Sequence, residues 1–240
     1  MKALILAAGL GTRLLPINAG RPKAMLEIMG LPLIHHLMQG LIEHGILDIT
    51  IVTGYQHAVL TNYILEAFPG QRIGFIYNRF FRQMNNIFSF YLCQPYLSGS
   101  EILVCNSDVY CEPDLLKDIL CVPPDTMVVD TQKEFSLEAT KVTFSAQGAI
   151  NRISKEIPPE QSQGEYIGIV KLSAKSTDLL FDAVREKLNQ GRTGLWFICV
   201  LNELLTEVSI MPFFTKGRVW EEIDYPADYF NLLDKLDHPT

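Results

Sequence analysis

Two short apolar runs flank an amphipathic segment near the start of the chain, and this arrangement constrains the fold most. Residues 3–8 and 49–53 are mostly apolar or β-branched and each run is followed by glycine, so both are expected to be buried strands. Between them, residues 32–44 carry apolar side chains at the spacing of one helix face. A strand, a helix and a strand in that order form a right-handed unit with parallel strands. The sequence therefore predicts an α/β fold built on a parallel sheet.

The same alternation continues to about residue 120 and then gives way to a strand-rich half. Up to that point the patterns predict helices at 57–68, 86–92 and 113–120, and strands at 73–77 and 101–105. Beyond it they predict strands at 127–130, 140–144, 150–154, 166–172 and 209–214, and helices at 177–188, 196–205 and 226–236. Since no linker or repeat interrupts the chain, we expect a single domain over residues 1–240 with a mixed sheet and a β-rich second half.

Composition excludes several classes of function. The 240 residues have a net charge of −7 and no basic block, which argues against a nucleic-acid partner. No apolar run approaches the roughly 20 residues that span a bilayer, and the N-terminal run is too short for a signal peptide, so we expect a cytoplasmic protein without a membrane partner. The five cysteines are odd in number and form no C-x-x-C pair, so neither a disulfide framework nor a structural zinc site is expected.

A glycine loop follows the first strand. Gly9 and Gly11 leave backbone N–H groups accessible, Thr12 and Arg13 come next, and Lys23 lies ten positions beyond Arg13. Backbone N–H groups flanked by cations attract anions, so the loop is a candidate site for the phosphates of a nucleotide.

Two familiar phosphate motifs do not fit this loop. A dinucleotide fingerprint requires a third glycine where Leu14 stands, and a Walker A loop requires a Gly-Lys-Ser/Thr run that is absent. A tight turn without a ligand is the alternative interpretation. The clustering of Arg13, Arg21 and Lys23 favours phosphate binding.

Carboxylates in two segments are candidate metal ligands. Asp108 follows the strand at 101–105, and the carboxyl ends of parallel strands are where α/β sheets bind ligands. If this strand neighbours the first one, Asp108 shares a crevice with the glycine loop. Glu222 and Asp224 alternate on one face of an extended segment. For Asp108 and Asp224 the alternative is helix capping, with Asp114 the better candidate to cap the helix at 113–120.

Taken together, these stretches resemble the signature of the nucleotidylyltransferases that activate sugar phosphates and similar compounds. The resemblance lies in residues 6–13, 22–26, 106–108 and 220–224. Within that family, small cytidylyltransferases for phosphocholine and aminoethylphosphonate are the most similar, through residues 85–89, 141–142, 153–155 and 164–169. The resemblance implies a Rossmann-like three-layer α/β/α fold with a mixed, mainly parallel sheet. It also implies attack of a phosphate or phosphonate oxygen on the α-phosphorus of CTP, with release of pyrophosphate, and a product of the kind used as a cell-surface glycan precursor.

The resemblance also assigns roles within the site. Arg13 and Lys23 would be the catalytic cations, and Asp108 and Asp224 would hold Mg²⁺. The expected nucleotide-binding residues are Leu6, Ala7, Ala8, Gly9, Gly11, Thr12, Asn86 and Ser89. The expected acceptor-binding residues are Lys141, Lys155, Glu165 and Glu222. Asn86 has helix capping as its alternative, and the two lysines have solvated strand positions as theirs.

Three other functions stay open on sequence alone. One is a sugar-1-phosphate nucleotidylyltransferase that uses UTP, GTP or dTTP. Another is a nucleotide-sugar glycosyltransferase, whose metal-binding D-x-D motif would have to be the incomplete Asn106-Ser107-Asp108. The third is a catalytically silent, nucleotide-sensing subunit, against which the joint presence of Arg13, Lys23, Asp108 and Asp224 argues. The sequence predicts no oligomeric state.

Overall fold

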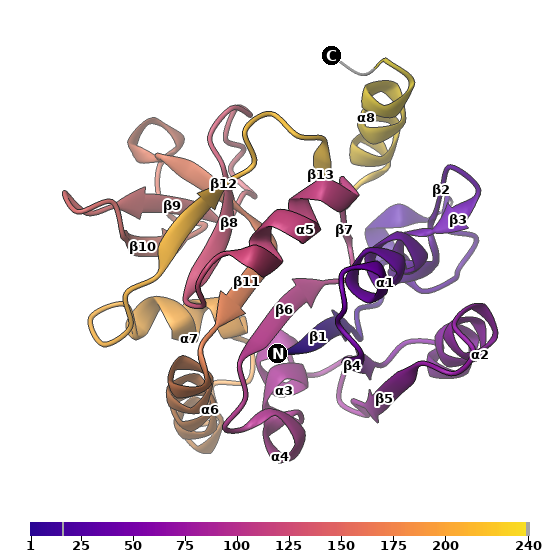
Figure 1. The fold of residues 1–240 in the computed structure, drawn as a ribbon, viewed down its shortest axis with the longest axis horizontal. Coiled ribbons are helices and arrows are strands. Elements are labelled where there is room, and N and C mark those ends of the chain that lie inside the picture. The colour runs from indigo at the N-terminus through magenta and orange to yellow at the C-terminus, as the bar shows by residue number, and fades with distance from the viewer. Residues whose placement is uncertain (16, 239–240) are drawn as a thin grey trace.

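A mixed sheet of nine strands forms the centre of the molecule in the computed structural model, which describes residues 1–15 and 17–238 (Figure 1). The strand order is β10-β9-β11-β6-β1-β4-β5, and β8 pairs with both β11 and β12. The mixed sheet confirms the predicted fold class.

The N-terminal half supplies the parallel strands. These are β1 (Lys2–Ala7), β4 (Asp48–Thr53), β5 (Arg72–Tyr77) and β6 (Ile102–Asn106). β1 lies between β4 and β6, with Leu6 opposite Val52 on one side and Asn106 on the other. The strand that precedes the glycine loop and the strand that precedes Asp108 are therefore neighbours and end at the same edge.

Helices cover both faces of this sheet, as expected for three layers. One face packs against α1 (Leu33–Glu43), α2 (His57–Ala67) and α5 (Pro113–Cys121). The other packs against α3 (Asn86–Tyr91), α4 (Gln94–Leu97), α6 (Ala174–Asn189) and α7 (Phe197–Glu203). Phe90 of α3 stacks on Phe181 of α6 at 4.6 Å and on Phe197 of α7 at 5.2 Å between ring centroids, which joins the three helices.

The second half supplies the antiparallel part of the sheet and one further parallel pair, β8 with β12. Its strands are β8 (Thr126–Asp130), β9 (Lys141–Phe144), β10 (Ile150–Ser154), β11 (Gly164–Leu172) and β12 (Met211–Phe214). β11 is central, because it pairs antiparallel with β6, β8 and β9. This strand joins the strand-rich half to the parallel sheet.

Two small sheets lie outside the large one. β7 (Val109–Cys111) pairs with β13 (Trp220–Glu222), and β2 (Glu27–Ile28) pairs with β3 (Leu31–Pro32). The final helix, α8 (Pro226–Asp237), packs its Leu232 into a cluster with Leu14, Ile28, Tyr110 and Ile223. The sequence patterns did not predict β2, β3, β7 or α4, because elements of two to four residues carry too little periodicity.

Most predicted elements are present with shifted ends. The helix predicted at 177–188 starts earlier, as α6, because the Ser173 side chain caps it by accepting a hydrogen bond from the Ser176 N–H at 3.2 Å. Three single-turn 3₁₀ helices, η1 (Thr12–Leu14), η2 (Lys23–Met25) and η3 (Pro159–Gln161), occur in loops. Within residues 1–15 and 17–238, no helix combines the length and the apolar character that crossing a membrane requires.

Candidate active site

A cavity of about 360 Å³ opens at the carboxyl ends of β1 and β6. It is lined by the glycine loop, the start of α3, the segment after β6, parts of β10 and β11, and the segment after β13. Most of the predicted site residues line it: Leu6, Ala8, Gly9, Gly11, Thr12, Arg13, Lys23, Asn86, Ser89, Asp108, Lys155, Glu222 and Asp224.

The glycine loop packs tightly against the lysine that follows it. Gly11 has a φ of 61°, and a Cβ at this position would lie 2.9 Å from the Cβ of Lys23. Only glycine meets both conditions, because a side chain would strain the backbone and push Lys23 away. The loop conformation and the position of Lys23 are therefore linked.

Asn18 joins the two ends of this loop and was missed by the sequence analysis. Its buried side-chain amide donates to the carbonyl oxygens of Gly11 at 3.3 Å and Arg21 at 3.1 Å. Its side-chain oxygen accepts from the Gly20 N–H at 3.1 Å. Asparagine close to glycine is typical of a turn, but no local sequence signal indicates which carbonyl groups its side chain binds.

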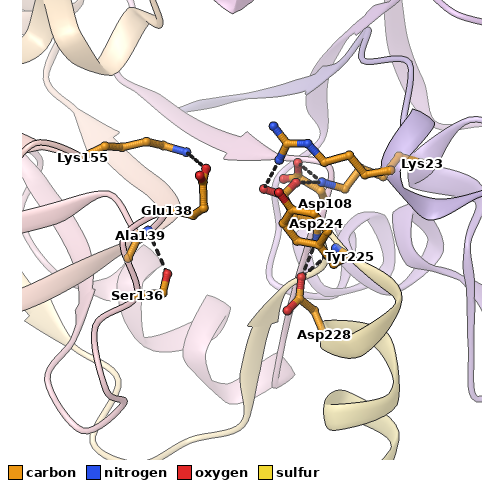
Figure 2. A network of polar contacts seen from close by, with 10 residues as sticks. Lys23, Asp108, Ser136, Glu138, Ala139, Lys155, Asp224, Tyr225 and Asp228 are labelled. Carbon is orange, nitrogen blue, oxygen red and sulfur yellow. Dashed lines mark hydrogen bonds and ion pairs between the residues drawn. The ribbon is translucent and has the colours of Figure 1, made fainter.

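Lys23 lies between the two carboxylates that the sequence singled out (Figure 2). Its Nζ is 2.8 Å from Oδ2 of Asp108 and 2.5 Å from Oδ1 of Asp224. Arg13 Nη1 approaches the other oxygen of Asp224 at 3.3 Å, and its guanidinium lies 5.2 Å from the centre of the Tyr225 ring. Two cations and two carboxylates from distant parts of the chain thus form one cluster at the edge of the sheet.

The charges in this cluster stabilise one another. Burial disfavours the charged form of Lys23, but the Asp108 and Asp224 carboxylates outweigh that effect and raise its pKa above the usual range. Burial likewise disfavours the Asp224 carboxylate, yet Lys23 and Arg13 together lower its pKa. Lys23 is therefore a permanent cation, and Asp224 is ionised at neutral pH.

The small sheet of β7 and β13 brings Asp224 to Asp108. Glu222 pairs with Val109, and the Ile223 N–H donates to the Asp108 carbonyl at 2.9 Å. In the part of the chain that the structure describes, neither Asp108 nor Asp224 caps a helix, which was the alternative role for both. Asp228 caps α8, because its Oδ2 accepts from the Asp224 N–H at 2.9 Å and the Tyr225 N–H at 2.8 Å (Figure 2). Both carboxylates are thus directed to the cavity.

Asp108 and Asp224 supply carboxylate oxygens of the kind that bind a divalent metal ion. Asp108 Oδ1 is buried and has no hydrogen-bond partner within residues 1–15 and 17–238, although its second oxygen contacts Lys23. Mg²⁺ prefers one or two carboxylates together with substrate phosphates and water. The donor set of Asp108 and Asp224 beside a phosphate loop fits that preference.

Lys155 marks the other end of the cavity (Figure 2). Its Nζ is 3.9 Å from the Glu138 carboxylate and 5.5 Å from the centre of the Trp196 ring, and both Lys155 and Trp196 line the cavity. Glu222 also lines the cavity, between this end and the cluster of Lys23, Asp108 and Asp224. Burial raises the pKa of Glu222 to about 8, and the carboxylates of Asp108 and Asp224 contribute to this rise. The cavity therefore has a cation at each end and carboxyl groups between them.

The start of α3 forms a third side of the cavity. Asn86 Oδ1 accepts from the Phe197 N–H at 2.9 Å, and Ser89 Oγ accepts from the Asn78 side chain at 3.0 Å. The helix cap is Asn85, whose side chain accepts from the Asn86 N–H at 2.8 Å. Asn86 and Ser89 therefore border the cavity while they also hold its wall together.

Three predicted site residues do not line the cavity, which corrects the expectation for their side chains. Ala7 packs against α1 and α2, because alternate residues of β1 point to opposite faces of the sheet. Lys141 is completely buried, and its Nζ donates to the carbonyl oxygens of Ser136 at 3.1 Å, Leu137 at 3.2 Å and Ala139 at 3.0 Å.

Glu165, the third of these, is buried away from the cavity in a polar cluster. It pairs across the sheet with Asp130 and Lys141. Burial raises its pKa to about 7, against the opposing effect of Lys133. Its charged neighbours are thus other protein groups, and we assign it no contact with an acceptor.

The comparisons with known proteins agree with this geometry. Residues 2–120 match the family described as Nucleotidyl transferase, and the chain belongs to that family of nucleotidyltransferases. Among its relatives is the choline-phosphate cytidylyltransferase of Streptococcus pneumoniae, which is 37% identical over 98% of both chains. The CTP:phosphoglutamine cytidylyltransferase of Campylobacter jejuni is 24% identical over 98% of this chain and 100% of its own. A solved structure of CTP:phosphocholine cytidylyltransferase from Streptococcus pneumoniae superposes with a TM-score of 0.82 and 26% identity over 98% of each chain.

Proposed function

We propose that this chain transfers CMP from CTP to a small phosphorylated or phosphonate acceptor and releases pyrophosphate. The observation that carries the proposal is Lys23 between Asp108 and Asp224, directly beside the glycine loop. The names of two full-length relatives, which refer to choline phosphate and phosphoglutamine with cytidylyl transfer, support both the nucleotide and the acceptor class.

The electrostatic problem in such a reaction is the meeting of two anions. At 4 Å, two unit charges repel by about 4 kcal/mol at an effective dielectric constant near 20. Arg13 would bind the β- and γ-phosphates, together with the N–H groups of Gly11 and Thr12. Lys23 would bind the α-phosphate and the incoming oxygen, where negative charge accumulates in the transition state. The protein thus supplies position and charge, and no protein nucleophile is needed.

Asp108 and Asp224 are proposed to hold Mg²⁺. When bound, the metal ion would supply Lewis-acid stabilisation of the phosphate charge. The ion pairs of Lys23 with the same two carboxylates raise its pKa above the usual range, which favours its cationic form. Oδ1 of Asp108 is the proposed ligand atom, because it is buried and has no hydrogen-bond partner within residues 1–15 and 17–238.

The other residues that line the cavity are assigned to the nucleoside and to the acceptor. We assign the nucleoside to Leu6, Ala8, Gly9, Asn86 and Ser89. We assign the acceptor phosphate to Lys155, with Glu222 bordering the same space. We further propose that the chain works as one domain, because the single large sheet takes strands from residue 2 to residue 214. A cytoplasmic location and a role in glycan precursors stay predictions.

The test is a matrix of substrates read by pyrophosphate release. CTP, UTP, GTP and dTTP are each combined with phosphocholine, aminoethylphosphonate and glucose 1-phosphate in the presence of Mg²⁺. We expect the highest kcat/KM with CTP and one of the two amine-bearing acceptors. Highest turnover of glucose 1-phosphate with UTP, GTP or dTTP would instead support the sugar-phosphate alternative. No pyrophosphate from any combination would contradict the proposal.

A further inference from the structure

Lys141 has a role that its sequence position does not suggest. A buried ammonium is costly unless every N–H bond has a partner, and the three carbonyl oxygens of Ser136, Leu137 and Ala139 supply three partners for its three protons. The backbone of residues 136–139 is therefore wrapped around one charged group. A loop held in this way has a defined conformation without regular secondary structure.

This loop, residues 131–140, borders the end of the cavity that contains Lys155. Thr140 lines the cavity, and the Glu138 carboxylate lies 3.9 Å from Lys155 Nζ (Figure 2). The loop is also fixed where it leaves β8, since Asp130 Oδ2 accepts from the N–H groups of Gln132 at 3.1 Å and Lys133 at 2.8 Å. Both ends of the loop are thus attached to the sheet, and Glu138 lies between them.

Glu138 and Lys155 form an ion pair beside the ring of Trp196. The side chain of Glu138 is 63% exposed and that of Lys155 is 42% exposed, so both can change partner at little cost. The Trp196 ring lies 5.5 Å from Lys155 and is itself accessible. A cation, a carboxylate and an aromatic face within a few ångströms match a small molecule that carries a phosphate and an ammonium group.

We propose that Glu138 is a specificity-determining residue that selects acceptors with a positive charge, and that Lys141 is the positioning residue that holds Glu138 in place. The inference rests on the proposed function, in which Lys155 binds the acceptor phosphate. With that phosphate on Lys155, the Glu138 carboxylate is released to pair with the ammonium group of the same acceptor. An acceptor without an ammonium group leaves Glu138 without a new partner and gains no affinity from it.

The test compares phosphocholine with 3,3-dimethylbutyl phosphate, in which an uncharged tert-butyl group of the same shape replaces the trimethylammonium group. This phosphate ester is the neutral analogue in the sense that its head group carries no charge. Glu138→Gln should raise the KM for phosphocholine about three- to fivefold, which is the range expected of an exposed ion pair, and leave the KM for the neutral analogue unchanged. The matched control is Glu134→Gln, an exposed carboxylate on the same loop for which residues 1–15 and 17–238 provide no ion pair. This control should leave both KM values unchanged.

Lys141→Met tests the positioning role. If it folds, it should reproduce the phosphocholine-selective rise in KM while the KM for CTP stays the same, a pattern that general destabilisation does not produce. If it does not fold, Glu138→Gln alone decides the specificity claim.

The KM measurements have three outcomes that would contradict part of the account. An unchanged ratio of the two KM values in Glu138→Gln overturns the inference, as does a wild-type enzyme that prefers the neutral analogue. A folded Lys141→Met variant with an unchanged ratio overturns the positioning role alone. A wild-type enzyme that releases no pyrophosphate with any acceptor contradicts the proposed function instead.

Discussion

At the scale of single residues, the site depends on one lysine that is held by two carboxylates. Lys23 is mostly buried, with a side-chain exposure of 12%, and both of its ion pairs join segments that are far apart in the sequence. Leaving a buried charge unpaired is costly, so Asp108, Asp224 and Lys23 specify one another's positions. In the proposed reaction the same ammonium group stabilises phosphate charge.

Replacement of Lys23 by methionine should affect catalysis much more than folding. We expect kcat to fall by about 10²- to 10³-fold, as is typical when a preorganised stabiliser of transition-state charge is removed. Pyrophosphate release measures the rate, and circular dichroism measures the fold. The matched control is Arg21→Met, because Arg21 lies on the same loop but is exposed and, among residues 1–15 and 17–238, forms an ion pair only with Glu27, at 3.7 Å. A loss of helical signal as large as the loss of rate would indicate a structural role for Lys23.

Gly11 offers a second test at this scale, with Gly20 as its control. Both glycines have positive φ values, 61° and 72°, so an alanine costs about 1–2 kcal/mol of backbone strain at either position. Only at Gly11 would the new Cβ approach Lys23, at 2.9 Å, since nothing lies within 4 Å of the corresponding position at Gly20. Both Gly11→Ala and Gly20→Ala should therefore lower the melting temperature, while only Gly11→Ala lowers kcat substantially. Equal loss of kcat in the two variants would mean that the contact with Lys23 is unimportant.

At the scale of elements, the pairing of β7 with β13 assembles the acidic half of the site. This pairing joins residues more than 100 positions apart, and it puts Glu222 and Asp224 beside Asp108. The adjacent Glu221 points away from the cavity, where its buried carboxylate binds the ammonium groups of Lys133 and Lys235. Alternation along one short strand thus separates the face toward the cavity from the face that holds Lys133 and Lys235.

The buried carboxyl group of β11 should make stability depend on pH. Burial raises the pKa of Glu165 from 4.5 to about 7, so between these values the folded chain binds a proton that the unfolded chain has lost. The free energy of unfolding therefore decreases as pH rises from about 4.5 to 7, by up to about 3 kcal/mol for this group.

Glu165→Gln removes this titration. We expect the melting temperature of the variant, relative to wild type, to be higher at pH 8 than at pH 5, as measured by thermal unfolding. Glu160→Gln, at an exposed position, should show no such difference. If the curves for wild type and Glu165→Gln run parallel from pH 5 to pH 8, the carboxyl group does not have the raised pKa described here.

The elements show what the sequence could and could not predict. Helices such as α1 and strands such as β4 were predicted because their apolar spacing is local and repeats over several residues. The burial of Lys141 was not predicted, because it depends on three carbonyl oxygens of an irregular loop that no periodicity encodes. The link between Asn18 and the glycine loop was missed for the same reason. The residues of the cavity were predicted from the types of charged residues and from the resemblance to nucleotidylyltransferases. The structure adds the strand order, which brings these residues close together.

At the scale of the whole molecule, the large sheet and the small sheet of β7 and β13 bring together groups from distant parts of the chain. The glycine loop follows β1, Asp108 follows β6, Lys155 follows β10, and Asp224 follows β13. We propose that the whole described chain is needed for activity, because the acceptor end and the metal end of the cavity come from different halves. Separate expression of either half should therefore yield no pyrophosphate from CTP, even with Mg²⁺ and an acceptor present.

The central claim is that Lys23, Asp108 and Asp224 form one metal-assisted centre for nucleotidyl transfer. Its most direct test is pyrophosphate release from CTP and phosphocholine by wild type and by Asp108→Asn, measured over a titration with Mg²⁺ after treatment with a chelator. Wild-type activity should be absent without the metal and return as Mg²⁺ is added, whereas Asp108→Asn should stay at least about 10²-fold slower at every concentration. Turnover by Asp108→Asn at the wild-type rate, or full wild-type activity in the chelator, would contradict the account.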